Sequence, residues 1–241
     1  MTRLYVYALL GSPPARAPGR GVVAEPVRIA RVGRLFAAVG AMPEAPPARP
    51  ATLRTHDAVV RRLARATGAL LPVRFGTLVA GVRELSRALA PRAAELRAAL
   101  ALVEGREQMT LRVFATAGAR QRRGRAGGGL GREPLRDVAP AARLGPGARY
   151  LATRMLAARR ARRVPEIAWL RPALRPFVAA ERVERYDAPP LVASVHHLIP
   201  RGDARAYLAA VASAATGRHD VRVLPSGPCP PYAFAPDTVG P

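Results

Sequence analysis

The stretch LYVYALL, residues 4–10, decides how the first half of the chain folds. It is apolar throughout, carries two tyrosines and stops at Gly11, which is typical of a short buried strand. Residues 27–32 alternate apolar and polar side chains and predict a half-buried strand. Residues 35–39 predict its hairpin partner across Gly33. The first elements of the chain therefore predict a sheet around residues 4–10.

Helical patterns follow this predicted sheet. Thr55 is a suitable N-cap for a helix whose apolar residues recur on one face. Residues 70–80 predict one further strand, and residues 82–103 predict a helical stretch that Pro91 interrupts. This order predicts an α+β domain over residues 1–106.

The second half repeats strands and helices in a different order. Strands are predicted at 111–116, 182–186, 191–198 and 220–224, and helices at 148–163 and 203–215. The order is βαββαβ, which is typical of a ferredoxin-like domain with a long basic helix. We assign this domain to residues 107–225. Residues 226–241 contain five prolines and predict a stiff, extended C-terminal tail without a regular element.

The charge of the chain is strongly positive. All 39 basic residues are arginine, only 16 residues are acidic, and the formal net charge is +23. Such an excess favours an anionic partner, and residues 121–125 with the helix 148–163 could neutralise phosphates. Nucleic-acid binding is therefore the alternative function. The Lys/Arg-Gly-aromatic pattern of RNA-binding sheets is missing, so a solvated arginine surface is the simpler interpretation.

Residue patterns of catalytic sites are absent from the sequence. It contains no HExxH, GxSxG or P-loop motif. His196 and His197 are neighbours on a predicted strand, so they point to opposite faces and cannot chelate one metal together. The single cysteine, Cys229, has no base close to it in sequence. We therefore expect no catalytic residue, no cofactor and no metal site, and without an 18-residue apolar run we expect no membrane span.

Five short segments occur in an order that is similar to one known family. They are HDAVV at 56–60, LPVRFGT at 71–77, EGRE at 104–107, GPGARYL at 145–151 and GPCPPYAF at 227–234. Together they resemble the gas vesicle protein F/L family, in which the last segment typically has tryptophan at the position of Cys229. The resemblance extends over nearly the whole chain.

This resemblance implies a function without catalysis. It implies an accessory protein that binds the small hydrophobic shell protein of gas vesicles, acts with other accessory proteins and supports nucleation or assembly of the vesicle in the cytoplasm. Arg74 would either pair with a carboxylate or contact the shell protein. The candidate partner-binding residues that the motifs imply are His56, Pro72, Arg74, Phe75, Gly76, Thr77, Glu104, Gly105, Arg106, Gly227, Pro228, Pro230, Pro231 and Tyr232.

Overall fold

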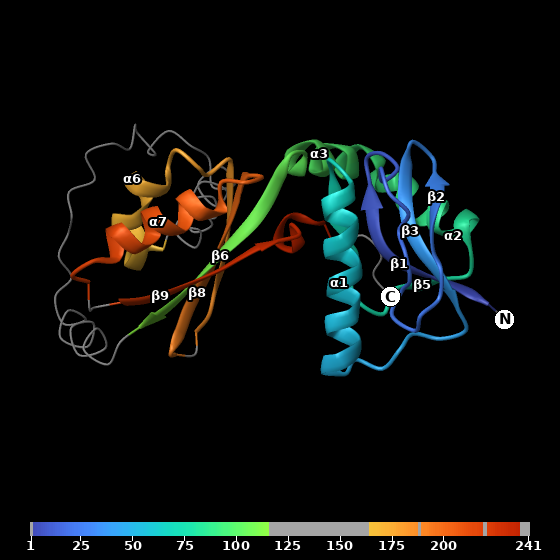
Figure 1. Ribbon diagram of the computed structural model, residues 1–241, viewed down its shortest axis with the longest axis horizontal. Helices are drawn as coiled ribbons and strands as arrows, with labels where there is room; N and C mark the ends of the chain where they lie inside the picture. Colours follow the sequence, from blue (N-terminus) through green and yellow to red (C-terminus); the bar gives the residue numbers. More distant parts are fainter. Residues whose placement is uncertain (1, 116–163, 188, 219–220, 237–241) are drawn as a thin grey trace, which may run out of the picture. The chain divides into compact units, whose positions relative to one another are not determined.

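Figure 1 shows the computed structural model, which describes residues 2–115, 164–187, 189–218 and 221–236. The predicted loop at 117–132 and the predicted helix at 148–163 lie outside these residues. The fold is mixed α+β with two antiparallel sheets. The chain divides into a first unit and a second unit. The first unit consists of Met1–Met109, Leu198–Ala204 and Gly227–Pro241, and the second of Thr110–His197 and Arg205–Ser226.

The predicted buried strand is the centre of the first sheet. Strand β1, Arg3–Leu10, pairs antiparallel with β3, Leu35–Met42, and β3 pairs with β2, Val27–Val32. Every residue from Tyr5 to Leu10 is fully buried, which explains the continuous apolar run. Gly33 turns the β2–β3 hairpin with a φ of +61°. The strand and hairpin predictions are confirmed, although β3 extends three residues further because it stays paired with β1.

Residues 70–80 do not form the single strand that was predicted. They form two short strands, β4 at Leu70–Pro72 and β5 at Leu78–Val79, and both pair antiparallel with β1. Two local features explain the interruption. Pro72 has no N–H to continue the ladder, and Gly76 adopts a φ of +87° in the turn between the strands.

The first helix, α1, spans Pro50–Ala66 and begins five residues before the predicted cap. Pro50 occupies the first helical turn, where its fixed φ favours the helix and its missing N–H costs nothing. The Thr52 hydroxyl accepts a hydrogen bond from the Arg49 N–H at 3.1 Å. The prediction of Thr55 as N-cap is therefore wrong, because Thr55 lies inside the helix and donates to the Ala51 carbonyl oxygen.

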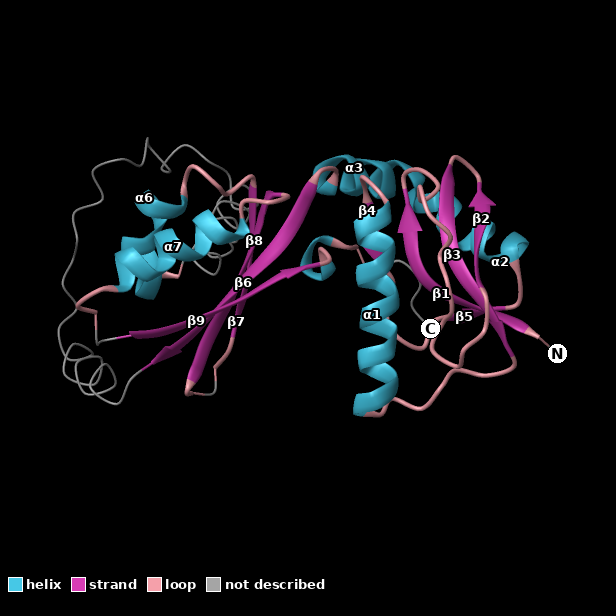
Figure 2. Cartoon of the chain, viewed as in Figure 1, coloured by secondary structure: helices cyan, strands magenta, loops and turns pink. Residues whose placement is uncertain are grey.

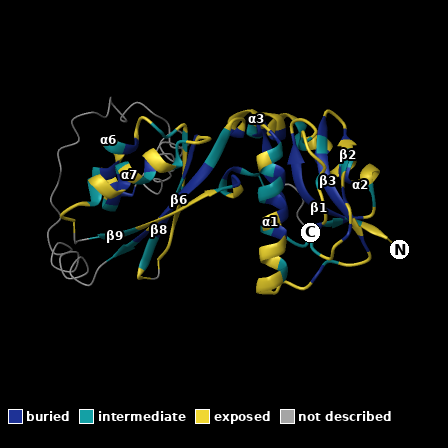
Figure 3. Ribbon diagram, viewed as in Figure 1, coloured by how far each residue is buried: buried dark blue, intermediate teal, exposed yellow. Residues whose placement is uncertain are grey.

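Two further helices complete the first unit (Figure 2). Helix α2 spans Val82–Leu89, a 3₁₀ turn (η1) spans Ala90–Arg92, and α3 spans Ala93–Val103, so the predicted interruption at Pro91 is confirmed. Figure 3 shows the buried residues of this unit gathered in the sheet and along one side of α1. The core cluster joins strand residues with the buried face of α1: Tyr5, Tyr7, Ala8, Leu10, Val27, Ala38, Met42, Val59, Val60, Leu63 and Leu70.

The second sheet has the strand order β7-β8-β6-β9. Its strands are β6 at Arg106–Ala115, β7 at Ala180–Arg185, β8 at Leu191–Pro200 and β9 at Val221–Cys229. The helical elements that accompany it are η3 at Pro165–Leu170, α6 at Arg171–Leu174 and α7 at Ala204–Ala215. None of the helices in the described ranges is long and apolar enough to cross a membrane.

Strand β9 corrects the prediction for the start of the tail. Residues 226–229 belong to this strand and not to an irregular segment, and a 3₁₀ turn, η4, follows at Tyr232–Phe234. The strand contains Pro225 and Pro228. Because β9 is at the edge of its sheet, prolines that cannot donate to a neighbouring strand are tolerated there.

Candidate functional site

Two of the motif residues, His56 and Phe75, meet at an aromatic cluster in the first unit. His56 of α1 stacks on Tyr7 with ring centroids 5.5 Å apart, and Phe75 contacts the His56 ring edge-on at 5.4 Å. The Tyr5 ring contacts the rings of Tyr7 and Phe75, with centroid distances of 4.8 Å and 6.1 Å. These tilted and edge-on arrangements are the favourable ones for aromatic rings. The cluster joins β1, α1 and the β4–β5 turn, which are far apart in sequence.

A chain of hydrogen bonds runs through this cluster. The Gly76 N–H donates to the Tyr5 hydroxyl at 3.1 Å, and the same hydroxyl lies 3.0 Å from His56 Nδ1. The Tyr5 hydroxyl can donate its hydrogen to Nδ1 when the imidazole is neutral and this atom carries no proton.

The ionisation of these groups follows from their burial. Burial lowers the pKa of His56, and the carboxylate of Asp57 and the backbone of Val73 oppose the shift only in part. Burial also raises the pKa of Tyr5 to about 12. Tyr7, whose hydroxyl donates to the Glu25 carboxylate, has a pKa raised mainly by burial. All three rings are therefore uncharged at neutral pH.

His56 makes the stability of the first unit depend on pH. Its pKa is lower in the folded protein than the value of about 6.5 expected in the unfolded chain. The unfolded state therefore binds more protons below pH 6.5, and the free energy of unfolding falls as the pH drops through this range. Well above pH 7 the His56 side chain is neutral in both the folded and the unfolded state, and its contribution to the free energy of unfolding is constant. We expect His56→Gln to show a smaller decrease in unfolding free energy between pH 7.5 and 5.5 than the wild type, measured by urea denaturation.

His196 also affects this measurement, but equally in the wild type and in the variant. Burial also lowers its pKa, so it contributes a decrease of the same sign in both proteins. The difference between wild type and variant then isolates His56. Equal pH dependence of the two proteins would contradict the assignment of a neutral, buried His56.

The turn between β4 and β5 presents the remaining residues of the LPVRFGT motif. Pro72 is buried, and the Thr77 hydroxyl donates to the Arg74 carbonyl oxygen at 2.7 Å, which closes the turn. The Arg74 side chain is exposed, and no carboxylate pairs with it in the described part of the chain. Arg74 lies in this turn and not on the strand that was predicted for it.

The EGRE motif forms the corner between α3 and β6. Glu104 caps the end of α3, and Gly105 turns the chain with a φ of +66°. The Gly105 N–H donates to the Gly68 carbonyl oxygen, and its own carbonyl oxygen accepts from the Arg201 N–H, both at 2.9 Å. Arg106 donates to the Leu102 carbonyl oxygen at 2.5 Å. The motif therefore fixes a backbone corner.

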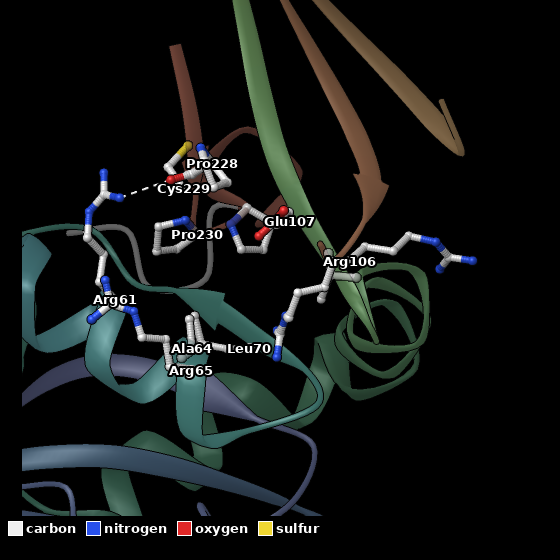
Figure 4. Close-up of a pocket in the computed structure, with 12 residues that line it drawn as sticks. Arg61, Ala64, Arg65, Leu70, Arg106, Glu107, Pro228, Cys229 and Pro230 are labelled. Atoms are coloured by element: carbon white, nitrogen blue, oxygen red, sulfur yellow. Dashed lines mark hydrogen bonds between the residues drawn. The ribbon is translucent and has the colours of Figure 1, made fainter. Parts of the chain in front are cut away.

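The C-terminal motif packs on α1 and on the first residues of β6, within the first unit. Pro230, Pro231 and Phe234 are buried. The Tyr232 hydroxyl donates to Asp57 Oδ1 at 2.9 Å, and the Arg61 guanidinium donates to the Pro228 carbonyl oxygen at 3.0 Å (Figure 4).

Gln108 adds two contacts to the same motif. Its side-chain carbonyl accepts from the Ala233 N–H at 2.9 Å, and its backbone carbonyl lies 3.4 Å from the Cys229 thiol. Burial raises the pKa of Cys229 to about 11, so the thiol is neutral. Cys229 is half-buried and acts here as a small packing residue.

Several residues that complete these clusters were not predicted. Tyr5 and Tyr7 lie two apart on a strand, and Asp57 and Arg61 lie four apart on a helix and form an ion pair at 2.6 Å. Both spacings place side chains on one face and could have been noticed. Gln108 bonds to Ala233, and the turn that holds Phe234 contacts β4; these contacts join residues far apart in the chain, and the sequence carries no local signal for them.

The two adjacent histidines of β8 have separate partners. His197 is buried and lies 2.7 Å from the Tyr207 hydroxyl and 3.1 Å from the Glu181 carboxylate. His196 lies 3.0 Å from the Thr110 hydroxyl. Within the described ranges, no three histidine, cysteine or acidic side chains gather in a group that could hold a metal ion.

Comparison with known proteins identifies the family. The family model described as "Gas vesicle synthesis protein GvpL/GvpF" matches residues 3–236. The crystal structure of the gas vesicle protein GvpF from Anabaena sp. PCC7120 is similar, with a TM-score of 0.71 and 18% identity over 98% of this chain and 97% of that one. GvpF from Microcystis aeruginosa has the same TM-score and identity, over 97% and 99% of the two chains. Comparison with curated protein sequences gives no match. At this identity the two crystal structures show a shared fold, and the family model, which spans nearly the whole chain, shows that this protein belongs to the gas vesicle GvpL/GvpF family.

Proposed function

We propose that this protein is an accessory protein that binds the small hydrophobic shell protein of gas vesicles and supports nucleation or assembly of the vesicle. The observation that carries the proposal is the family match over residues 3–236. The protein would act by binding, without a cofactor and without catalysis, together with other accessory proteins at gas vesicles in the cytoplasm.

The physical need for such a partner follows from the shell protein itself. A small, strongly apolar subunit exposes surface that drives aggregation before it is built into a shell. A larger protein that covers this surface lowers the concentration of free apolar subunits. Arginines outnumber acidic residues about two to one in the described part of the first unit, so an acidic rim on the partner would be attracted to it.

Among the motif residues, Arg74 is the one that we propose to contact the partner. It is exposed in a turn whose backbone is fixed by Thr77 and Gly76. Phe75 lies in the aromatic cluster, Thr77 closes the turn, and the residues before Arg74 in the motif are buried. A rigid turn that carries a free guanidinium can bind a carboxylate or backbone carbonyl with little further loss of entropy.

We also propose that the second sheet with α7 is the predicted ferredoxin-like domain. The strand order supports this assignment. Strand β8 lies between β6 and β7, and β6 lies between β8 and β9, as expected when two βαβ halves are each split by a strand of the other. In this proposal residues 1–106 and 107–225 are the two domains, and residues 226–241 are the Pro-rich C-terminal tail.

Co-purification tests the proposed function. The tagged full-length protein is co-expressed with a gas vesicle shell protein, treated with nuclease and recovered at physiological salt. We expect the shell protein to be retained by the wild type and by Arg83→Gln, and to be retained less by Arg74→Gln. Arg83 is an exposed arginine of α2, so its replacement makes the same change of charge elsewhere.

Three outcomes would decide against parts of the proposal. Failure of the wild type to retain the shell protein would overturn the function. Retention of nucleic acid in place of shell protein, with a steep loss on added salt, would favour the alternative. Equal retention by Arg74→Gln and Arg83→Gln would remove Arg74 from the interface and leave the function standing.

A further inference from the structure

The turn that carries Arg74 is attached to strand β1 at both of its ends. At its start, the Val73 N–H donates to the Tyr7 carbonyl oxygen at 3.0 Å. At its end, the Thr77 carbonyl oxygen accepts from the Val6 N–H, also at 3.0 Å. Both bonds join backbone groups, so they fix the ends of the turn independently of its side chains. The residues between these ends are held by further contacts.

One buried hydroxyl holds the middle of this turn. The Gly76 N–H donates to the hydroxyl of Tyr5 at 3.1 Å, and Tyr5 is fully buried in β1. The preceding residue, Phe75, places its ring against the Tyr5 ring at a centroid distance of 6.1 Å. A polar group that loses its partner next to such apolar rings is also kept from water, which costs free energy. The Tyr5 hydroxyl therefore fixes the backbone beside Arg74.

The same hydroxyl is bonded to a group that titrates. It lies 3.0 Å from His56 Nδ1, which can accept its hydrogen only while this atom carries no proton. Protonation turns both ring nitrogens of a histidine into donors. The Tyr5 hydrogen then loses its acceptor, and the Tyr5 oxygen faces two donors, the imidazolium and the Gly76 N–H. One oxygen atom thus couples the protonation of His56 to the backbone of the turn.

The surroundings of the imidazole disfavour its charged form. The titratable and charged groups on the segments packed around it are Tyr5, Tyr7, Glu25, Asp57, Arg61 and Arg74. The Glu25 carboxylate accepts from the Tyr7 hydroxyl and from the Val23 N–H. The Asp57 carboxylate is paired with Arg61 at 2.6 Å. Neither carboxylate is hydrogen-bonded to His56 within the described ranges, and burial lowers the pKa of His56.

We propose that Tyr5 and His56 position the turn that carries Arg74, and that protonation of His56 releases this turn. At neutral pH the Tyr5 hydroxyl joins the Gly76 N–H to the imidazole, and Arg74 projects from a fixed backbone. In acid the hydroxyl loses its acceptor, and the turn opens while the sheet stays folded. The consequence for the partner rests on the proposed function, in which Arg74 contacts the shell protein: binding weakens as the pH falls.

Amide hydrogen exchange of the full-length protein, measured by NMR, tests whether Tyr5 holds the turn. We expect the Gly76 N–H to be less protected than the N–H of Ala38 in the buried middle of the sheet, because the turn opens without the sheet. Tyr5→Phe should lower the protection of Gly76 at pH 7.5 by about tenfold, the usual effect of losing one hydrogen bond. Equal protection of Gly76 and Ala38 in the wild type would mean that only global unfolding exposes the turn, which contradicts the proposal.

Tyr207→Phe is the matched control for this variant. Tyr207 is also fully buried, and its hydroxyl lies 2.7 Å from the Nδ1 atom of His197 in the second unit. The control removes the same kind of bond and should leave the protection of Gly76 unchanged. Unchanged protection of Gly76 in Tyr5→Phe, or an equal decrease in both variants, overturns the proposal.

The same measurement at pH 7.5 and 5.5 tests the role of His56. With protection corrected for the intrinsic exchange rate at each pH, we expect that of Gly76 in the wild type to fall by up to about tenfold, because pH 5.5 lies about one unit below the pKa of an exposed histidine. This fall should be absent from His56→Gln and present in His197→Gln, the matched change in the second unit. Equal falls in the wild type and His56→Gln overturn the proposal. If His56→Gln does not fold, the wild type decides, since constant protection of Gly76 at the two pH values has the same consequence.

Co-purification with a gas vesicle shell protein at the same two pH values tests the consequence for binding. We expect the wild type to retain less shell protein at pH 5.5 than at pH 7.5, and His56→Gln to show a smaller difference. The shell protein is the same in both experiments, so its own titration cancels in the comparison. Equal pH dependence of retention overturns the regulation of binding. If the wild type retains no shell protein at pH 7.5, the proposed function fails, and the exchange measurements still decide whether Tyr5 and His56 position the turn.

Discussion

Replacement of Phe234 with alanine is expected to lower the free energy of unfolding by about 3–5 kcal/mol. The phenylalanine ring is only 1% exposed and belongs to the turn η4, which contacts β4 of the first unit. Truncation would remove its buried apolar area and leave a cavity that the flanking prolines cannot fill, because their backbone is stiff. Urea denaturation of the purified protein measures the change.

A second variant in the same turn separates ring burial from loss of a surface hydrogen bond. Tyr232 is 39% exposed, and its hydroxyl donates to the Asp57 carboxylate. Tyr232→Phe keeps the ring and removes this bond, and Asp57 remains paired with Arg61. We expect a loss of about 1 kcal/mol or less. If Phe234→Ala costs no more than Tyr232→Phe, then the C-terminal motif does not contribute to the core of the first unit.

Replacement of Gly227 with alanine should destabilise the protein by about 2–4 kcal/mol. Two observations support this expectation. Gly227 has a φ of +125°, a region that residues with a Cβ rarely adopt. A Cβ placed there would lie 2.8 Å from the Gln108 carbonyl oxygen and 2.8 Å from Met109 Sδ. The close approach of β9 to β6 leaves no room for a side chain, and thermal and urea denaturation both report the change.

Gly33 provides a matched control for this substitution. It also has a positive φ, +61°, but a Cβ built there meets no atom within 4 Å. Gly33→Ala therefore measures the backbone strain without the steric contact, and we expect a cost of about 1–2 kcal/mol. Equal costs at the two positions would show that β6 moves aside for the new methyl group at Gly227.

The strands of the first sheet could be predicted because their signal is local. The run from Tyr5 to Leu10 is apolar since both of its faces are covered, and the turn at Gly33 separates two alternating segments. The boundaries of the helices were harder to predict from the sequence than the strands. Thr55 has the chemistry of an N-cap, yet Pro50 starts the helix, because a proline in the first turn and the Thr52 hydroxyl together provide the same function earlier.

The strand at the C-terminus shows where local rules fail. The five prolines of residues 226–241 predict an irregular segment, but the structure places the first of them, Pro228, in β9 together with Pro225. A proline is excluded from a strand only where its missing N–H would face a partner, and the position of β9 at the sheet edge decides this. The order of the strands is a property of the assembled sheet and cannot be obtained from the residues near a proline.

For the candidate sites, the sequence by itself determined the family motifs, the excess of arginine and the periodicity that places His56 on the buried face of α1. Tertiary structure decided what these residues do. His56 became neutral because β1 and the β4–β5 turn bury it beside Tyr5, and Arg74 stayed exposed because its motif is a turn. Arg65, Arg106 and Arg201, which are far apart in the sequence, line one pocket of the first unit. The net charge of a chain can be counted from its sequence. The burial of a side chain and the residues that surround it depend on contacts that form only when the chain folds.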